Sequence, residues 1–286
     1  MQFPSVAVRA ITPVGFLVLA SLLALGNARV TAGDYSDNAW TILLAGTHEK
    51  SGEKRALAVA TLDLLPDEPK AVRAAEEALQ DSNPAVRLAA VTALGDMDAR
   101  ASLPKIKALL ETAGGKELMA IAAVLKKFND PEGYEIYYEI LTGTRKAGGG
   151  ILAGLKDKKN LERMGIEEAL GFVPYSGIGI GAYYYLKQNE SANNNLLVVS
   201  AIALANDPDP ATEKALIQAS YDAKDPVKVA ALRALAKRGD PAALKEIEPA
   251  MHSEKSIVSY TAAAAVVRLS NVPHYRRPTE ANARKR

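Results

Sequence analysis

The chain has no cysteine among its 286 residues, which excludes a disulfide framework, a thiol nucleophile and any thiolate metal site. Histidine is also scarce. The three histidines, His48, His252 and His274, lie far apart in the sequence, so they are not expected to bind one metal ion together. We therefore expect no metal site and no bound cofactor.

Common catalytic and nucleotide-binding motifs are missing as well. In the run from Gly177 to Gly181 the third glycine comes one residue too early for a dinucleotide fingerprint. The stretch from Gly143 to Gly149 lacks the Lys-Ser/Thr pair of a phosphate-binding loop, and no Gly-x-Ser-x-Gly elbow occurs. The sequence therefore predicts a protein without catalytic activity of its own.

The chain carries little net charge. Without Arg9 and Arg29, the basic residues of the first 32 positions, 33 basic residues face 33 acidic ones. The tail at 271–286 is basic and is expected to be disordered. Since phosphate binding draws on many clustered cations, nucleic acid is not expected as a ligand.

The only long apolar run lies at the N-terminus. Arg9 precedes an uninterrupted apolar stretch, Val14 to Leu25, and the small-residue pattern Val30-Thr31-Ala32 follows it. This stretch is short for a membrane-spanning helix, so residues 1–32 are predicted to be a secretory signal peptide cleaved after Ala32 rather than an uncleaved anchor. Export without cysteine favours a periplasmic or secreted bacterial protein.

What the sequence does contain is a repeated apolar stripe. Each copy has small or apolar residues at i, i+3, i+4, i+7 and i+8, which form one face of a helix. The clearest copies are Val86, Ala89, Ala90, Ala93, Leu94 and Val227, Ala230, Ala231, Ala234, Leu235. The central alanines allow a neighbouring helix to approach closely, so Ala90→Leu or Ala231→Leu should overpack, whereas an exposed Arg87→Ala should be nearly neutral.

Further copies of the stripe recur at one fixed interval along the chain. The stripe that starts at Glu117 follows the Val86 copy by this interval, and the stripe that starts at Val258 follows the Val227 copy by the same interval. Another stripe starts at Leu196, one interval before Val227, and a degenerate copy starts at Ala56, as expected for an end repeat with one uncovered face. The interval lies within the range of roughly 20–50 residues that is typical of a solenoid of stacked units.

Asp-Pro and Asn-Pro pairs mark the helix starts within this pattern and indicate two helices per unit. The segments Asp81–Gly95 and Asp225–Leu235 resemble HEAT repeats, of the short variety also found in phycobiliprotein lyases. The resemblance covers about residues 38–142 and 194–270. It implies an all-α HEAT-like α-solenoid of about six helix pairs, in which the second helices line the concave side of a protein-binding scaffold.

Residues 143–193 interrupt the repeats between the first half, 33–142, and the second half, 194–270. Ten of the 20 glycines lie between Gly143 and Gly181, and residues 171–186 contain five aromatic residues and no charge. This insertion in the fourth repeat has three interpretations: an apolar lid on the solenoid, a partner-docking element, or a membrane contact. Because the repeat register resumes after it, the flanking helices are expected to form one repeat and to fold without it.

The sequence therefore predicts an exported HEAT-repeat scaffold or adaptor that mediates protein–protein interaction. The alternatives are a membrane-associated assembly factor that uses residues 171–186, and a lyase-like or chaperone-like HEAT protein. The candidate partner-binding residues are Phe172, Tyr175, Ile178, Ile180, Tyr183, Tyr184, Tyr185, Arg87, Lys228 and Arg233.

Overall fold

The structure is a computed structural model that describes residues 32–66, 68–142, 192–207 and 209–271. Within these ranges the chain forms helices, joined by turns and short loops, and no strand. Residues 1–31 of the predicted signal peptide, residues 143–191 of the predicted insertion and residues 272–286 of the predicted tail lie outside the described residues. The fold is an all-α HEAT-like solenoid, as the resemblance implies.

The helices fall into two blocks along the chain. The first block comprises α2 (Ala32–Thr47), α3 (Gly52–Thr61) with η2 (Leu62–Leu64), α4 (Pro69–Ala78), α5 (Pro84–Asp96), η3 (Arg100–Ser102), α6 (Leu103–Ala108), η4 (Leu109–Glu111), α7 (Gly115–Lys127) and α8 (Pro131–Thr142). The second comprises α13 (Ala192–Ala203) with η5 (Leu204–Asn206), α14 (Pro210–Ala219), α15 (Asp225–Arg238), η6 (Pro241–Ala243), α16 (Leu244–Ile247), η7 (Glu248–His252) and α17 (Ser256–Ser270).

The Asn-Pro and Asp-Pro pairs lie at helix starts as predicted, although Asp225 is itself the first residue of α15, whose start has no side-chain cap. The side chain of Asn83 accepts a hydrogen bond of 2.9 Å from the backbone N–H of Ala85, and a proline follows it at the first helical position of α5. Asp209 and Asp240 cap α14 and η6 in the same way. These caps satisfy backbone donors that a helix leaves unpaired at its start, so each unit begins at a defined residue.

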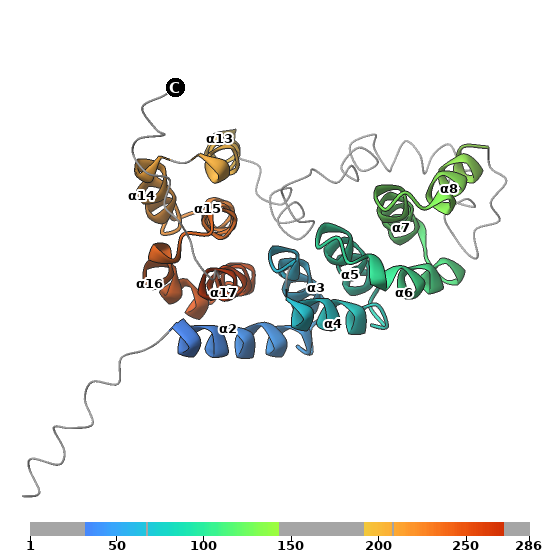
Figure 1. Ribbon diagram of the computed structural model, residues 1–286, viewed down its shortest axis with the longest axis horizontal. Coiled ribbons are helices and arrows are strands. Elements are labelled where there is room, and N and C mark those ends of the chain that lie inside the picture. The colour runs from blue at the N-terminus through green and yellow to red at the C-terminus, as the bar shows by residue number, and fades with distance from the viewer. Residues whose placement is uncertain (1–31, 67, 143–191, 208, 272–286) are drawn as a thin grey trace, which may run out of the picture.

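The helices form an arc with an inner and an outer row (Figure 1). The inner row runs in the order α13, α15, α17, α3, α5, α7, each helix packed on the next, while α14, α16, α2, α4 and α6 lie on the outer side. This order differs from the order along the chain. The last helix of the second block, α17, packs directly on α2 and α3, so the second block precedes the first in space. The stack is a circular permutation of the chain.

We call the packing of α17 on α2 and α3 the closing contact. It is tight: a Cβ added to Gly46 of α2 would lie 2.7 Å from the ring of Tyr260 on α17 and 2.8 Å from the Cβ of Ala58 on α3. Arg268 donates a 2.6 Å hydrogen bond to the carbonyl oxygen of Leu64, at the end of η2. Two segments far apart in the sequence are thus joined at van der Waals distance.

Four of the predicted stripes are buried as expected, namely those that start at Val86, Glu117, Val227 and Val258. The stripe that starts at Leu196 is the exception, because Leu196 and Val199 are exposed. The helix that carries it, α13, stands first in the spatial order and has no preceding neighbour among the described helices of the inner row. The stripe itself is intact, but no described helix covers it.

The expectation that the helices flanking the insertion pack together as one repeat is wrong in this structure. Helix α8 packs on α7 and helix α13 packs on α15, at opposite ends of the arc. The degenerate repeat α2–α3, expected at an end, is instead interior, between α17 and α5. Register along the sequence determines the spacing of repeats but cannot tell which end is joined to which, because every repeat offers similar faces.

Candidate partner-binding surface

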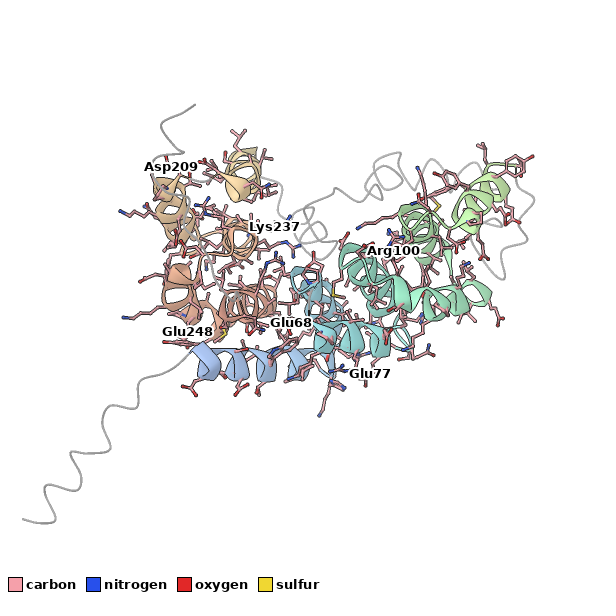
Figure 2. All side chains as sticks on the ribbon, in the orientation of Figure 1. Glu68, Glu77, Arg100, Asp209, Lys237 and Glu248 are labelled. Atoms are coloured by element: carbon pink, nitrogen blue, oxygen red, sulfur yellow. The ribbon has the colours of Figure 1, made fainter. Side chains whose placement is uncertain are left out.

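Charged residues gather at the carboxyl ends of the inner helices. Asp96, Lys127, Lys237 and Arg268 each follow the last stripe position of their helix by two residues, so the repeat places them along one edge. Asp63 of η2 and Arg233 of α15 join them. We call these six residues the inner-edge cluster. Figure 2 labels Lys237 on the inner side of the arc, whereas Glu77 and Glu248 lie on the outer side.

The cluster contains a buried ion pair between the two blocks of the chain. The Nη1 group of Arg233 donates to Oδ1 of Asp63 at 3.1 Å, and its Nη2 group donates to Oδ2. Each side chain is only 8% exposed. The Nε atom of Arg233 is buried and has no hydrogen-bond partner among the described residues. A bidentate geometry of this kind fixes the relative position of α15 and η2.

Asp96 lies in a crowded environment although 38% of its side chain is accessible. The Nζ atom of Lys127 is 3.6 Å from its Oδ1 and donates a 2.7 Å hydrogen bond to the carbonyl oxygen of Gly95. Burial by the surrounding helices raises the pKa of Asp96, and the nearby charge of Asp63 raises it further, against the opposing effect of Lys127. The carboxylate thus has protein on most sides and water on one.

The pKa of Lys237 is shifted in the opposite direction to that of Asp96. Burial lowers the pKa of its amino group, and the charge of Arg233 adds to this, while Asp63 and Asp96 oppose it. The inner-edge cluster contains four basic and two acidic side chains, so it carries an excess of positive charge in a partly desolvated place. A carboxylate from a binding partner would relieve this imbalance.

Of the candidate residues chosen from the sequence, Arg87 and Arg233 each form an ion pair with a residue of another repeat. The guanidinium group of Arg87 binds Glu117 of the next repeat at 2.7 and 2.9 Å, and its side chain is only 18% exposed. The expectation that Arg87 is exposed is therefore wrong. Arg55 binds Asp81 in the same manner one repeat earlier, at 2.7 and 2.8 Å. The buried Glu117 replaces an apolar residue in its stripe, and that substitution was the available sequence signal.

The remaining candidates are dispersed. Lys228 is partly buried, with its Nζ atom 3.5 Å from Oδ1 of Asp225 in the same helix. Phe172, Tyr175, Ile178, Ile180 and Tyr183 to Tyr185 lie outside the described residues, so their predicted role in binding stays a prediction. Sequence reasoning missed Asp96, Lys127, Lys237 and Arg268, although their constant offset from the stripe is visible in the printed sequence.

Within the described ranges no three side chains of the metal-binding types gather in one place. No helix in these ranges has the length and apolar character needed to cross a bilayer. The inner-edge cluster brings four basic and two acidic side chains close enough that their charges shift the pKa values of Asp96 and Lys237, so its chemistry is that of charge recognition.

Comparison with protein families agrees with the repeat architecture. Residues 41–135, from within α2 to within α8, match a family model described as HEAT repeats. No curated protein sequence matches the chain significantly. The second block continues the same stack through the closing contact, and α14 and η6 have the same type of N-cap as α5. Residues 41–135 contain HEAT repeats, and the described chain folds as an all-α HEAT-like solenoid.

Proposed function

We propose that the protein is an exported scaffold or adaptor that binds an acidic segment of a partner protein along the inner edge of its arc. HEAT repeats commonly mediate protein–protein interaction, and solenoids use their concave side as an extended binding surface. The inner helices line this side (Figure 1). A role in catalysis is not part of the proposal.

The observation that carries the proposal is the inner-edge cluster. Helices of five repeats each contribute at least one charged side chain to the same edge, and Lys127, Lys237 and Arg268 also lie near helix carboxyl ends, where cations are favoured. An extended peptide that runs along the edge would meet these cations in succession. Charge complementarity of this type gives specificity and a fast, salt-dependent association.

A peptide probe tests the chemistry of the edge. We expect a fluorescent glutamate-rich peptide to bind the full chain, and a glutamine-rich peptide of equal length to bind at least tenfold more weakly by fluorescence anisotropy. Combined Lys127→Gln and Lys237→Gln should weaken glutamate-peptide binding about tenfold and make it less sensitive to salt. The matched control is Lys245→Gln, an exposed lysine of α16 in the outer row. Equal binding of both peptides, or equal loss in the control, would overturn the proposal.

Export is the second element of the proposal and rests on Arg9, the apolar run to Leu25 and the small residues before Gly33. Mass spectrometry of the native protein should find a mature N-terminus at Gly33. A soluble cytoplasmic form that keeps residues 1–32 would contradict export without affecting the binding edge. The alternatives, a membrane-associated assembly factor that uses residues 171–186 and a lyase-like or chaperone-like HEAT protein, stay predictions, because residues 171–186 lie outside the described residues.

A further inference from the structure

The two ends of the arc expose apolar residues in a pattern that the rest of the described molecule buries. At one end, α8 presents Tyr134, Tyr138 and Leu141, which are 57%, 67% and 86% exposed. Their spacing of four and three residues places them on one face of the helix. Met119 and Ala123 of the adjoining α7 are partly exposed. Such a stripe on a folded helix marks an interaction surface.

At the other end, α13 presents the stripe that starts at Leu196. Leu196 is 67% exposed and Val199 is 62% exposed, whereas Val86 and Val227, which start the equivalent stripes of α5 and α15, are at most 2% exposed. No residue of α13 carries a charge, so covering this face would desolvate no ion.

The packing of the interior repeats indicates which kind of element should cover the stripe of α13. One interior contact shows which way a stripe faces: Val124 in the stripe of α7 lies against Gly95 of α5 in the preceding repeat, where an added Cβ would be 2.6 Å from its Cγ2. The stripe of α13 therefore faces the position of a preceding repeat that the described residues do not supply.

The opposite end supplies the missing half. Every other outer helix has an inner helix that follows it along the chain, as α2 has α3 and α14 has α15. Helix α8 follows the inner helix α7 along the chain and so takes the place of an outer helix, yet among the described helices no inner helix follows it at its side. Conversely, α13 is an inner helix without a described outer helix before it. One end of the described stack is thus the complement of the other.

We propose that two copies of this chain join end to end, with the end formed by α7 and α8 of one copy packed on α13 of the next. Helix α7 then takes the place of the preceding inner helix against the stripe of α13, and the apolar face of α8 packs beside it. The contact completes one HEAT-like repeat and continues the solenoid across the copies. It is heterologous, since each copy uses two different surfaces, so repeated addition gives an open filament or a closed ring. This inference goes beyond the scaffold function and does not depend on the acidic partner.

Two single variants of the full chain disable one end each. Tyr138→Glu places a charge on the face of α8, and Val199→Glu places a charge on the stripe of α13. Both residues are exposed, so stability should change little, which thermal unfolding checks. Ala215→Glu adds the same charge at an exposed position of α14 and serves as the matched control. We expect the wild type and the control to gain mass with concentration in light scattering after gel filtration, and each end variant to shift this association at least tenfold.

A mixing experiment identifies the geometry. Neither end variant can pair with itself, but Val199→Glu keeps a normal α8 and Tyr138→Glu keeps a normal α13. An equimolar mixture should therefore form a dimer with one copy of each and nothing larger. A wild type that stays monomeric at all concentrations, as it would if its own chain covered both faces, overturns the proposal. Equal association of the wild type and both variants, or a mixture that forms no dimer, overturns it too.

Discussion

Arg233 of α15 and Asp63 of η2 stand far apart in the chain and form a bidentate ion pair in which each side chain is 8% exposed. The pair joins the second block of helices to the first. Asp63 occupies a stripe position that is apolar or alanine in most other repeats, which is why its repeat reads as degenerate. The irregularity marks a junction between blocks rather than an end of the stack.

Removal of Arg233 should be costly. Arg233→Met leaves the Asp63 carboxylate buried and without its cation, and loss of one member of a buried pair typically costs about 3–5 kcal/mol. The double variant Asp63→Leu, Arg233→Met should recover most of that loss, because a well-packed apolar pair can replace a buried ion pair. Urea unfolding of the four proteins gives the coupling energy; an additive double variant would show that the two residues do not interact.

The closing contact should tolerate no side chain at position 46. Gly46→Val would force its methyl groups into the ring of Tyr260 and into Ala58, and overpacking of this kind costs about 1–3 kcal/mol. Thr41→Val, at an exposed position of the same helix, should stay within about 0.5 kcal/mol. Thermal unfolding compares the two. A harmless Gly46→Val would mean that α2 and α17 are not in contact.

Acid should weaken the stack through Asp81. The hydrogen bond from Arg55 lowers the pKa of the Asp81 carboxyl from its ordinary value of 3.8, and the backbone N–H of Asn83 lowers it further. Because the folded-state pKa lies below the unfolded one, this stabilisation is present above the unfolded pKa of 3.8 and is lost as the pH falls through the folded value. Asp81→Asn and Arg55→Met should each be less stable at pH 7 and lose less stability in acid. Unchanged acid sensitivity in both would contradict this role.

Substitution of Arg87 should be far from neutral. Arg87→Ala removes the cation that binds Glu117, whose side chain is 5% exposed, and leaves a buried charge at a cost of about 3–5 kcal/mol. Glu117→Ala in the same background restores the apolar stripe and should recover most of the loss. Chemical denaturation measures both. If Arg87→Ala alone costs no more than an ordinary surface substitution, Arg87 is a solvated surface residue and this interpretation of its ion pair is wrong.

Periodicity predicted the helices, their caps and the buried stripes, since these depend only on residues a few positions apart. The stripes of α5 and α15 were assigned residue by residue. Trp40, the single tryptophan, also packs into the core, where it is 7% exposed with Lys70 over its ring. Such local features can be predicted from the sequence because each repeat packs on its neighbours in the same way.

The order of the repeats in space could not be predicted in that manner. Similar stripes on α3 and α13 give no indication of which one α17 or α7 should meet, and the ion pair of Asp63 with Arg233 has no signature at short range. The inner-edge cluster was missed for a related reason. Asp96 and Lys237 are ordinary charged residues at helix ends, and only the arc brings them near each other.

Replacing residues 144–191 by a short linker tests the order of the repeats in space. Six inner helices spaced at about 8–10 Å span roughly 40–50 Å, whereas a linker of about six residues reaches about 20 Å at most. Replacing residues 144–191 by such a linker should therefore open the closing contact or drive exchange of blocks between copies, seen as dimers or larger species in light scattering. A monomer of unchanged stability would favour a contact between α8 and α13 within one chain.

The most direct test is a circular permutant that begins at Ala192, runs to Asn271, continues through a flexible glycine–serine linker to Ala32, and ends at Thr142. Because α17 and α2 pack directly on each other and are each about 22–24 Å long, a linker of about 15 residues can join their ends. The account predicts that this chain, without residues 143–191, keeps its helical circular dichroism and unfolds in one cooperative transition near the temperature of the parent. A permutant that fails to fold, while the chain with the short linker at 144–191 folds normally, would contradict it.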